Sequence, residues 1–256
     1  MTYLLRLSAC LFLCVSLNSF GAYVFINEGS QHIAAYNSVS GIRPSFGYLS
    51  ENGSPSYPNI SGLASSENHL YYSINGDVSR INVSDPTNGN WVGQGSFFSQ
   101  FNRESEYVAS LNATDGLAYG EGFLYFSNNG NVSRYDLETS LITNININNA
   151  TSGLAYGNDT LYFSNNGNVS RYDLSSNVVE DININNATNG IAFGGGYLFY
   201  SNSDGYVVKF NINNESEIVI GYLDAMSGDS LAYQKSPVPL PAGIYLFLSG
   251  LVGLGL

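Results

Sequence analysis

A unit of 37 residues repeats along the middle of the chain, and it constrains the fold more than any other feature. Residues 116–152 and 153–189 are identical at 26 of 37 positions, which include GLAYG, LYFSNNGNVSRYDL and ININNAT. A third copy begins at Gly190, a looser one at Gly62, and Ser230 opens a fragment, SLAYQ. The spacing between the first two copies is longer and indicates an insertion of about 17 residues. The chain is therefore expected to be a repeat protein.

Each copy divides into four predicted strands, at 116–120, 124–127, 132–137 and 142–148 in the best-defined unit. Asn129-Gly130 separates the second strand from the third, and this dipeptide is the strongest short-range signal for a β-hairpin. The fourth strand alternates Ile with Asn, which is typical of a half-exposed strand. Four strands in a unit of this length predict the blade of a β-propeller.

The two ends of the repeat region complement each other. Residues 22–37 resemble a second and third strand without a first, and residues 230–234 resemble a first strand alone. Together they make one blade, so we predict an all-β propeller with five four-stranded blades. The N- and C-terminal strands would close the ring, with Ala232 beside residues 23–27. A β-solenoid is the main alternative, and two hairpin turns in each unit fit it less well.

The repeat pattern YFSNNGNVSRYDLETSLI resembles the YVTN-type and related propeller repeats of bacterial surface proteins. The resemblance covers most of the region between the two ends of the chain. It implies a propeller fold and an extracellular setting, but propellers host many functions.

Residues 1–21 have the pattern of a secretory signal peptide. Arg6 precedes an apolar stretch over residues 7–17, and Ser19 and Gly21 are small residues at the −3 and −1 positions of a cleavage site. We expect a signal helix that is removed after Gly21. Cys10 and Cys14 lie inside it, so the mature protein is expected to have no disulfide, thiolate metal site or thiol nucleophile.

Residues 235–256 are predicted to be a surface-sorting tail. Val238, Pro239, Leu240, Pro241 and Ala242 precede the apolar stretch GIYLFLSGLVGLGL. This order resembles the PEP-CTERM class of sorting signals in its VPLPA variant. The resemblance implies an apolar helix that inserts transiently into the membrane, processing by an exosortase-type enzyme, and location in a Gram-negative envelope or extracellular matrix. The basic cluster of such signals does not appear, so we expect the tail to be truncated or incomplete. A buried C-terminal helix or strand is the alternative.

Composition excludes some partners and offers no catalytic group. The formal net charge is −12, which disfavours nucleic acid and anionic lipid because both require clustered Lys and Arg. His32 and His69 have no His or Cys partner at ligand spacing. Asn-Gly turn chemistry accounts for the Asn and Asp clusters without a calcium loop. We therefore predict no enzyme activity, no cofactor and no metal.

Strand order predicts two different faces of the disc. The turns between second and third strands should meet the connections between blades, which gives an amide-rich candidate binding face. Its residues are Asn128, Asn129, Asn149, Asn165, Asn166, Asn186 and Asn202. The other face should be acidic, with residues such as Glu121 and Asp159. Neutral amides near aromatic rings suit sugar hydroxyls.

The third strand carries a repeated charged pair, Arg134 with Asp136 and Arg171 with Asp173. Because the two residues of each pair are two positions apart, their side chains lie on the same face of a strand. We expect these residues to make structural ion pairs or hydrogen bonds between blades, repeated by duplication.

These features predict an exported, non-catalytic surface or matrix protein in which a propeller binds exopolysaccharide or surface proteins. A self-associating structural matrix component is one alternative, because the Asn-alternating fourth strand is an exposed edge. A secreted hydrolase or lyase is the other, and the sequence contains no acid–base motif that favours it.

Overall fold

A computed structural model describes residues 22–27, 32–38, 45–48, 60–83, 105–188, 190–222 and 230–235. Every regular element in these residues is a β-strand, and Ala22–Lys235 form one compact unit. The predicted signal helix, the apolar tail helix and the sorting motif at 238–242 lie outside the described residues.

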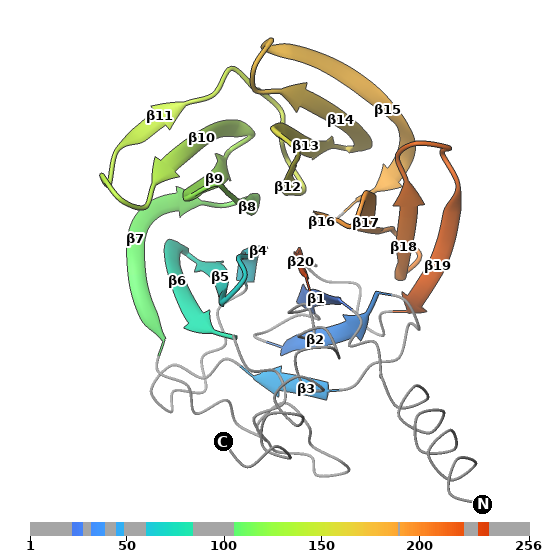
Figure 1. Cartoon of the computed structure of the whole chain (residues 1–256), viewed down its shortest axis with the longest axis horizontal. Helices are drawn as coiled ribbons and strands as arrows, with labels where there is room; N and C mark the ends of the chain where they lie inside the picture. The colour runs from blue at the N-terminus through green and yellow to red at the C-terminus, as the bar shows by residue number, and fades with distance from the viewer. Residues whose placement is uncertain are drawn as a thin grey trace, which may run out of the picture. The chain divides into compact units, whose positions relative to one another are not determined.

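The strands of the described residues form five four-stranded sheets around a common centre, which is the arrangement of a β-propeller (Figure 1). Sheet 1 contains β20 (Leu231–Gln234), β1 (Tyr23–Asn27), β2 (His32–Asn37) and β3 (Ser45–Tyr48). Sheet 2 contains β4 (Ile60–Ser65), β5 (His69–Ile74), β6 (Gly76–Asn82) and β7 (Glu106–Ala113). Sheet 3 contains β8 (Gly116–Gly120), β9 (Phe123–Asn128), β10 (Asn131–Asp136) and β11 (Ile142–Asn144). Sheet 4 contains β12 (Leu154–Gly157), β13 (Thr160–Asn165), β14 (Gly167–Asp173) and β15 (Val178–Ala187). Sheet 5 contains β16 (Ile191–Gly194), β17 (Tyr197–Ser201), β18 (Tyr206–Asn211) and β19 (Glu217–Tyr222).

The predicted pairing of the two ends of the repeat region is present in sheet 1. The C-terminal strand β20 runs antiparallel to the N-terminal strand β1, and Phe25 stands opposite Ala232. The other edge of β1 pairs with β2, where Phe25 stands opposite Ala35. The first strand of this sheet therefore comes from one end of the domain and the other three from the opposite end.

The fourth strand of sheet 3 is shorter than the sequence predicts. It was expected over 142–148, but β11 ends at Asn144. Beyond it Val132 N–H donates to the Ile147 carbonyl at 3.2 Å, and Ile145 N–H donates to the Val132 carbonyl at 2.9 Å. Because both bonds converge on one residue, the chain bulges away from regular pairing. Ile147 is still only 2% exposed, so the predicted alternation of inward and outward side chains survives the irregular backbone.

The buried apolar side chains of the described residues form five clusters, and each cluster lies between two neighbouring sheets. The cluster between sheets 5 and 1 contains Val24, Ile26 and Leu231 from sheet 1, together with Phe199 and Val207 from sheet 5. Burying each large side chain contributes about 1.5–3 kcal/mol. The core is thus a ring of interfaces rather than one central cluster.

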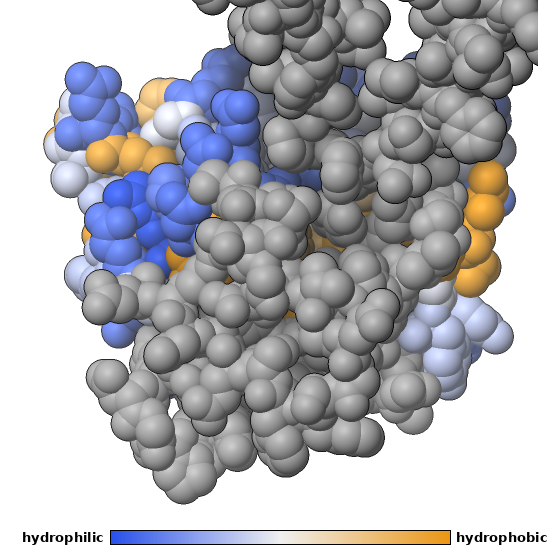
Figure 2. Space-filling model, turned by 60° about the horizontal axis from the view of Figure 1, so that its bottom comes forward, coloured by the Kyte–Doolittle hydropathy of each residue, from blue (hydrophilic) through white to orange (hydrophobic). Residues whose placement is uncertain are grey.

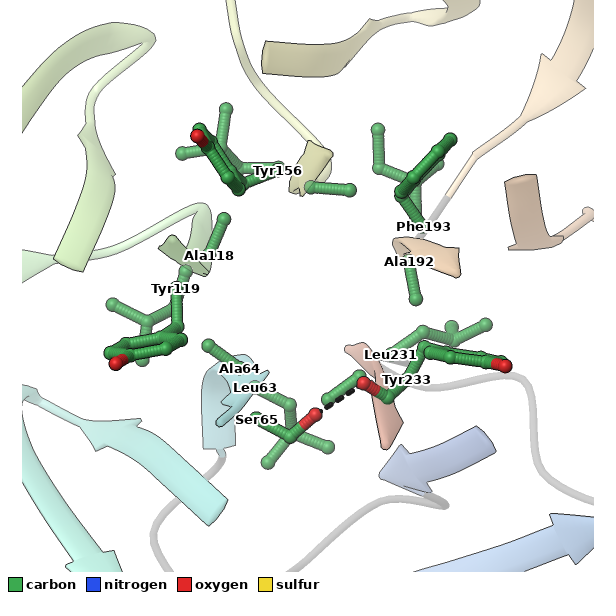
Figure 3. A pocket seen from close by; sticks show the side chains of 15 residues that line it. Leu63, Ala64, Ser65, Ala118, Tyr119, Tyr156, Ala192, Phe193, Leu231 and Tyr233 are labelled. Carbon is green, nitrogen blue, oxygen red and sulfur yellow. Dashed lines mark hydrogen bonds between the residues drawn. The ribbon is translucent and has the colours of Figure 1, made fainter. Parts of the chain in front are cut away.

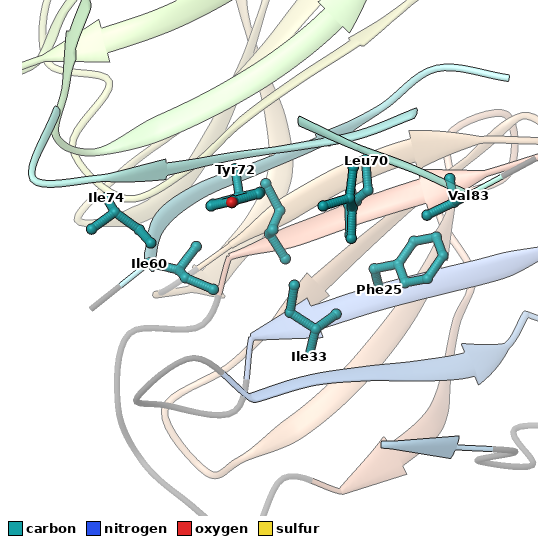
Figure 4. Close-up of a cluster of buried hydrophobic side chains, with 10 residues drawn as sticks. Phe25, Ile33, Ile60, Leu70, Tyr72, Ile74 and Val83 are labelled. Carbon is teal, nitrogen blue, oxygen red and sulfur yellow. The ribbon is translucent and has the colours of Figure 1, made fainter. Parts of the chain in front are cut away.

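The cluster between sheets 1 and 2 is drawn in Figure 4. Phe25 and Ile33 approach from sheet 1, and Leu70 and Tyr72 face them from sheet 2. Val83, which follows β6, covers the end of the cluster beside Phe25. Neither sheet could bury these groups without the other.

An aromatic residue from the first strand of one sheet lies flat on a glycine of the sheet before it. A Cβ added to Gly157 would lie 1.8 Å from Phe193 Cδ1, and one added to Gly120 would lie 2.1 Å from Tyr156 Cδ1. The Phe193 ring also stacks on Tyr162, with centroids 5.2 Å apart. Glycine at the end of the GLAYG motif is therefore required by the close approach of the next sheet.

The junction between sheets 1 and 2 replaces this contact with a polar one. Gln234 occupies the glycine position, and Ser65 occupies the aromatic position across from it. The Ser65 hydroxyl donates to the Tyr233 carbonyl. Gln234 Nε2 donates to the carbonyls of Glu67 at 3.2 Å and Val83 at 3.4 Å. A larger side chain on one sheet is thus matched by a smaller one on the next.

The aromatic-on-glycine contact predicts a strong coupling between Gly157 and Phe193. Gly157→Ala should lower the free energy of unfolding by about 1–3 kcal/mol because the new methyl group overpacks the interface. In a Phe193→Ala background the same substitution should cost less than about 1 kcal/mol, because the ring that it meets is gone. Urea unfolding of the four variants measures the coupling. An equal cost in both backgrounds would show that Phe193 does not impose glycine at this position.

Candidate binding face

The turns between the second and third strands have the hairpin geometry that the sequence predicts. Asn129 and Gly130 have φ values of 49° and 82°, and Asn166 and Gly167 have 50° and 88°. Two consecutive positive φ values define the type I′ turn, whose twist matches that of the flanking strands. Asn tolerates this conformation better than other residues with a side chain, which explains its recurrence.

These turns lie against the connections that lead into the next sheet. Gly130 forms an isolated bridge with Ala150, and Gly167 pairs with Ala187. A Cβ on Gly130 would lie 3.2 Å from Asn149 Cα. The expectation that turns and connections meet on one side of the disc is thereby confirmed. We call this surface the amide face.

The threonines of the repeated Asn-Ala-Thr connections hold the turns in place. Thr114 Oγ1 accepts the N–H of Asn129 at 3.1 Å, and Thr151 Oγ1 accepts that of Asn166 at 3.4 Å. Asp115 Oδ2 accepts the N–H of Gly130 at 3.2 Å. The N-x-T pattern that would otherwise be taken as a glycosylation signal therefore has a structural explanation.

The predicted amide side chains are arranged in the same way in successive sheets. Asn129 Nδ2 donates to Asn128 Oδ1 at 2.8 Å, and Asn166 Nδ2 donates to Asn165 Oδ1 at 3.1 Å. Asn129 and Asn166 are exposed, and so are Asn149 and Asn186. In each turn the Oδ1 of the second asparagine and the Nδ2 of the first are not used by this side-chain bond.

Asn202 belongs to a different turn. Its Oδ1 accepts the N–H groups of Asp204 at 3.1 Å and Tyr206 at 2.9 Å. Gly205 has a φ of 80°, but Asp204 does not have a positive φ. Asp204-Gly205 therefore does not form a type I′ turn like that of Asn129-Gly130, because one additional residue lengthens this hairpin.

On the opposite side of the disc the repeated aspartates cap turns instead of pairing with arginine. Asp173 Oδ1 accepts the Ser175 hydroxyl at 2.6 Å and the N–H groups of Ser175 and Ser176 at 2.9 and 2.8 Å. These bonds, the Ser175 hydroxyl foremost, lower the pKa of Asp173 to about 2. Asp136 Oδ1 accepts from the backbone of Glu138 and Thr139, whose N–H groups lower its pKa in the same direction.

The repeated arginines bind within their own sheet, which corrects the expectation of ion pairs between blades. Arg80 makes two bonds to Glu106, at 2.9 and 2.8 Å, from β6 to β7. Arg171 pairs with Glu180 from β14 to β15. Arg134 has Thr143 opposite it and lies 4.8 Å from the Phe123 ring centroid. The partner of each arginine is set by the residue that stands opposite it on the neighbouring strand. The spacing of residues within one strand does not show which residue that is.

The axial channel is too small for an organic ligand. Residues of the five innermost strands line it, and the alanines labelled in Figure 3 point inward from them. Its volume is about 40 Å³. At about 10–15 Å³ for each water molecule, the channel accommodates about three or four waters.

A larger groove of about 380 Å³ lies over sheet 4. It is lined by Thr160, Arg171, Asp173, Ser176, Val178 and Glu180. Arg171 and Glu180 bind each other there, and Asp173 Oδ1 is used by its own turn. The charged side chains of this groove therefore form bonds within the domain itself.

No group of three or more potential metal-ligating side chains occurs within the described residues. His69 is half-buried, and burial together with nearby Arg80 lowers its pKa. Across the same residues no helix is long and apolar enough to cross a membrane.

No protein-family model matches the sequence, and no curated protein matches it. Among solved structures, a chain in the crystal structure of a nidogen/laminin complex is similar to this one with a TM-score of 0.53 and 8% identity. The match covers 82% of this chain and 98% of that chain. Two computationally designed proteins also match: Ika8 (TM-score 0.40, 13% identity, 74% of this chain and 55% of that chain) and Ika4 (0.39, 14%, 65% and 97%). At 8% identity the first match shows the fold alone.

Proposed function

We propose that the protein is an exported, non-catalytic binding protein of the bacterial surface or matrix, and that its amide face binds a polysaccharide. The observation that carries this proposal is the repetition of the amide turns. Asn129 and Asn166 occupy the same place in successive sheets, with the same backbone conformation and the same side-chain bond. A surface that repeats with a fixed period suits a ligand that also repeats.

The chemistry of the face selects among polysaccharides. Amide groups donate and accept hydrogen bonds without charge, as sugar hydroxyls do. The formal net charge of −12 repels anionic polymers such as uronic-acid chains. The proposed ligand is therefore a neutral hydroxylated polymer.

The ring that carries this face is proposed to be a closed five-bladed propeller. Its support is the pairing of β20 with β1 and the contact of each innermost strand with the next, from β4 through β8, β12, β16 and β20 back to β4. A closed ring holds the amide turns at fixed spacings, so that one polymer can contact several of them.

Export and surface sorting complete the proposal, and both rest on the sequence of the two ends. The compact unit Ala22–Lys235 leaves out the predicted signal peptide and almost all of the predicted tail. Mass spectrometry of the protein recovered outside a Gram-negative host should find an N-terminal peptide that begins at Ala22. A retained Met1 in the recovered protein would contradict removal of the signal peptide.

Self-association through outer strands is the second candidate, because several apolar side chains there are exposed. Ile218 and Val219 of β19 are 62% and 57% exposed, and Figure 2 shows hydrophobic atoms at the rim of the molecule. Register shifts interrupt pairing along β7, β15 and β19. Such irregularities protect sheet edges from pairing with another chain. A strict monomer in sedimentation at high concentration would exclude this candidate.

Removing amides from the amide face should weaken binding of a neutral glucan. The double variant Asn129→Gly with Asn166→Gly keeps the positive φ of both turns while it deletes both amides. We expect the Kd, measured by affinity electrophoresis or calorimetry, to rise about three- to tenfold through lost hydrogen bonds. Asn158→Gly is the matched control, since Asn158 is exposed with a φ of 53° in a turn on the opposite side. Equal losses in both variants, or none in either, would contradict the assignment.

A further inference from the structure

Sheet 5 departs from the repeat where it meets the amide face. The residue before the first valine of the third strand is Asn131 in sheet 3 and Asn168 in sheet 4, and both are exposed. Tyr206 takes this place in sheet 5, since Val207 and Val132 stand opposite equivalent serines, Ser201 and Ser127. A large aromatic group thus replaces an amide in one sheet.

A second tyrosine stands directly opposite the first. Tyr222 of β19 pairs with Tyr206 of β18, and their ring centroids are 5.4 Å apart with planes inclined by 61°. Tyr206 is 41% exposed and Tyr222 is 56% exposed. The two rings form a continuous aromatic surface that we call the tyrosine pair.

The tyrosine pair differs from the aromatic contacts that hold the sheets together. Those rings stack nearly parallel between sheets, as Tyr162 does with Phe193, and Tyr162 is only 4% exposed. The tyrosine pair lies within one sheet and leaves about half of each ring in water. Tyrosine rings left exposed side by side present an apolar surface with a polar edge, which is typical of an interaction site.

Polar groups lie in the turn that precedes Tyr206. Asn202 Oδ1 accepts the Tyr206 N–H, and Ser203 Oγ donates to Asn186 Oδ1 at 3.1 Å across the connection from sheet 4. Within the described part of the chain, no hydrogen bond engages the Nδ2 groups of Asn202 and Asn186. Two amide donors are therefore fixed through their own oxygens at the turn that leads into Tyr206.

We propose that the tyrosine pair is the primary contact for a pyranose ring of the polymer, an inference that rests on the proposed function. The apolar C–H face of the sugar lies on one tyrosine ring, and the hydroxyls at its edge accept from Asn202 and Asn186. The inclined second ring limits how the sugar turns. The remaining amide turns then contact neighbouring units of the same polymer.

Substitution of the tyrosines tests this assignment with a soluble neutral glucan as the probe. Tyr206→Ala and Tyr222→Ala, introduced separately into the complete chain, should each raise the Kd at least fivefold, while Tyr206→Phe stays within twofold because the ring remains. Tyr107→Ala is the matched control, since Tyr107 is a 61% exposed tyrosine on β7, and it should bind as the wild type does.

A second measurement needs no substitution. Nitration of tyrosines in the wild-type protein, mapped by mass spectrometry, should show Tyr206 and Tyr222 protected by the glucan and Tyr107 unprotected. Wild-type affinity in both alanine variants, together with unchanged nitration, would overturn the tyrosine pair as the contact.

The outcomes separate this inference from the proposed function. If the glucan binds and the Asn129→Gly with Asn166→Gly variant weakens it, but the tyrosine variants do not, only the tyrosine pair is rejected. If the wild type binds no glucan, the proposed function fails as well. Loss of self-association in Tyr222→Ala without any glucan binding would assign the pair to a contact between copies and overturn the inference.

Discussion

Contact between neighbouring sheets is the interaction on which the rest of this structure depends. Each of the five clusters in the described residues draws its buried apolar side chains from two neighbouring sheets, so the sheets share their core. The aromatic-on-glycine contact sets how closely two sheets approach, because Tyr156 and Phe193 lie where a Cβ on the preceding glycine would have to be. Stacked pairs contribute about 0.5–1.5 kcal/mol beyond the area that they bury.

The junction between sheets 1 and 2 has a different chemistry. Gln234 and Ser65 replace glycine and an aromatic residue, and Gln234 Oε1 is buried without a hydrogen-bond partner in the described residues. A buried amide with one unsatisfied atom lowers the free energy of unfolding. It also disfavours packing against an apolar surface, which could not bond its other atoms. The polar pair thus distinguishes the junction of sheets 1 and 2 from the others, where the aromatic contacts resemble one another.

The sequence predicted the parts of the fold that short-range chemistry decides. The five residues of GLAYG became β8 without change, and the Asn-Gly dipeptides became type I′ turns because those turns need positive φ at both positions. The pairing of β20 with β1 was predictable because the incomplete units at the two ends sum to one. The amide face followed from strand order alone.

Features that depend on neighbouring strands and sheets were not predictable in this way. Arg171 binds Glu180, a residue on the next strand whose register the sequence does not reveal. The early end of β11 depends on a local bulge, although the residues of its continuation are the same as in the longer β15. The tyrosine pair was not predicted because the predictions rested on positions that repeat, whereas Tyr206 stands where sheets 3 and 4 have Asn131 and Asn168.

Hydrogen exchange of the intact domain tests most directly whether the two ends close the ring. If the interfaces form one cooperative circuit, the hydrogen-bonded amides of β20 exchange only by global unfolding, as slowly as those of the buried strands β9 and β13. The account predicts equal protection in peptides that cover 231–234, 123–128 and 160–165. Exchange in 231–234 that is a hundredfold or more faster, while β9 and β13 remain protected, would show that β20 only rests against the ring and does not close it.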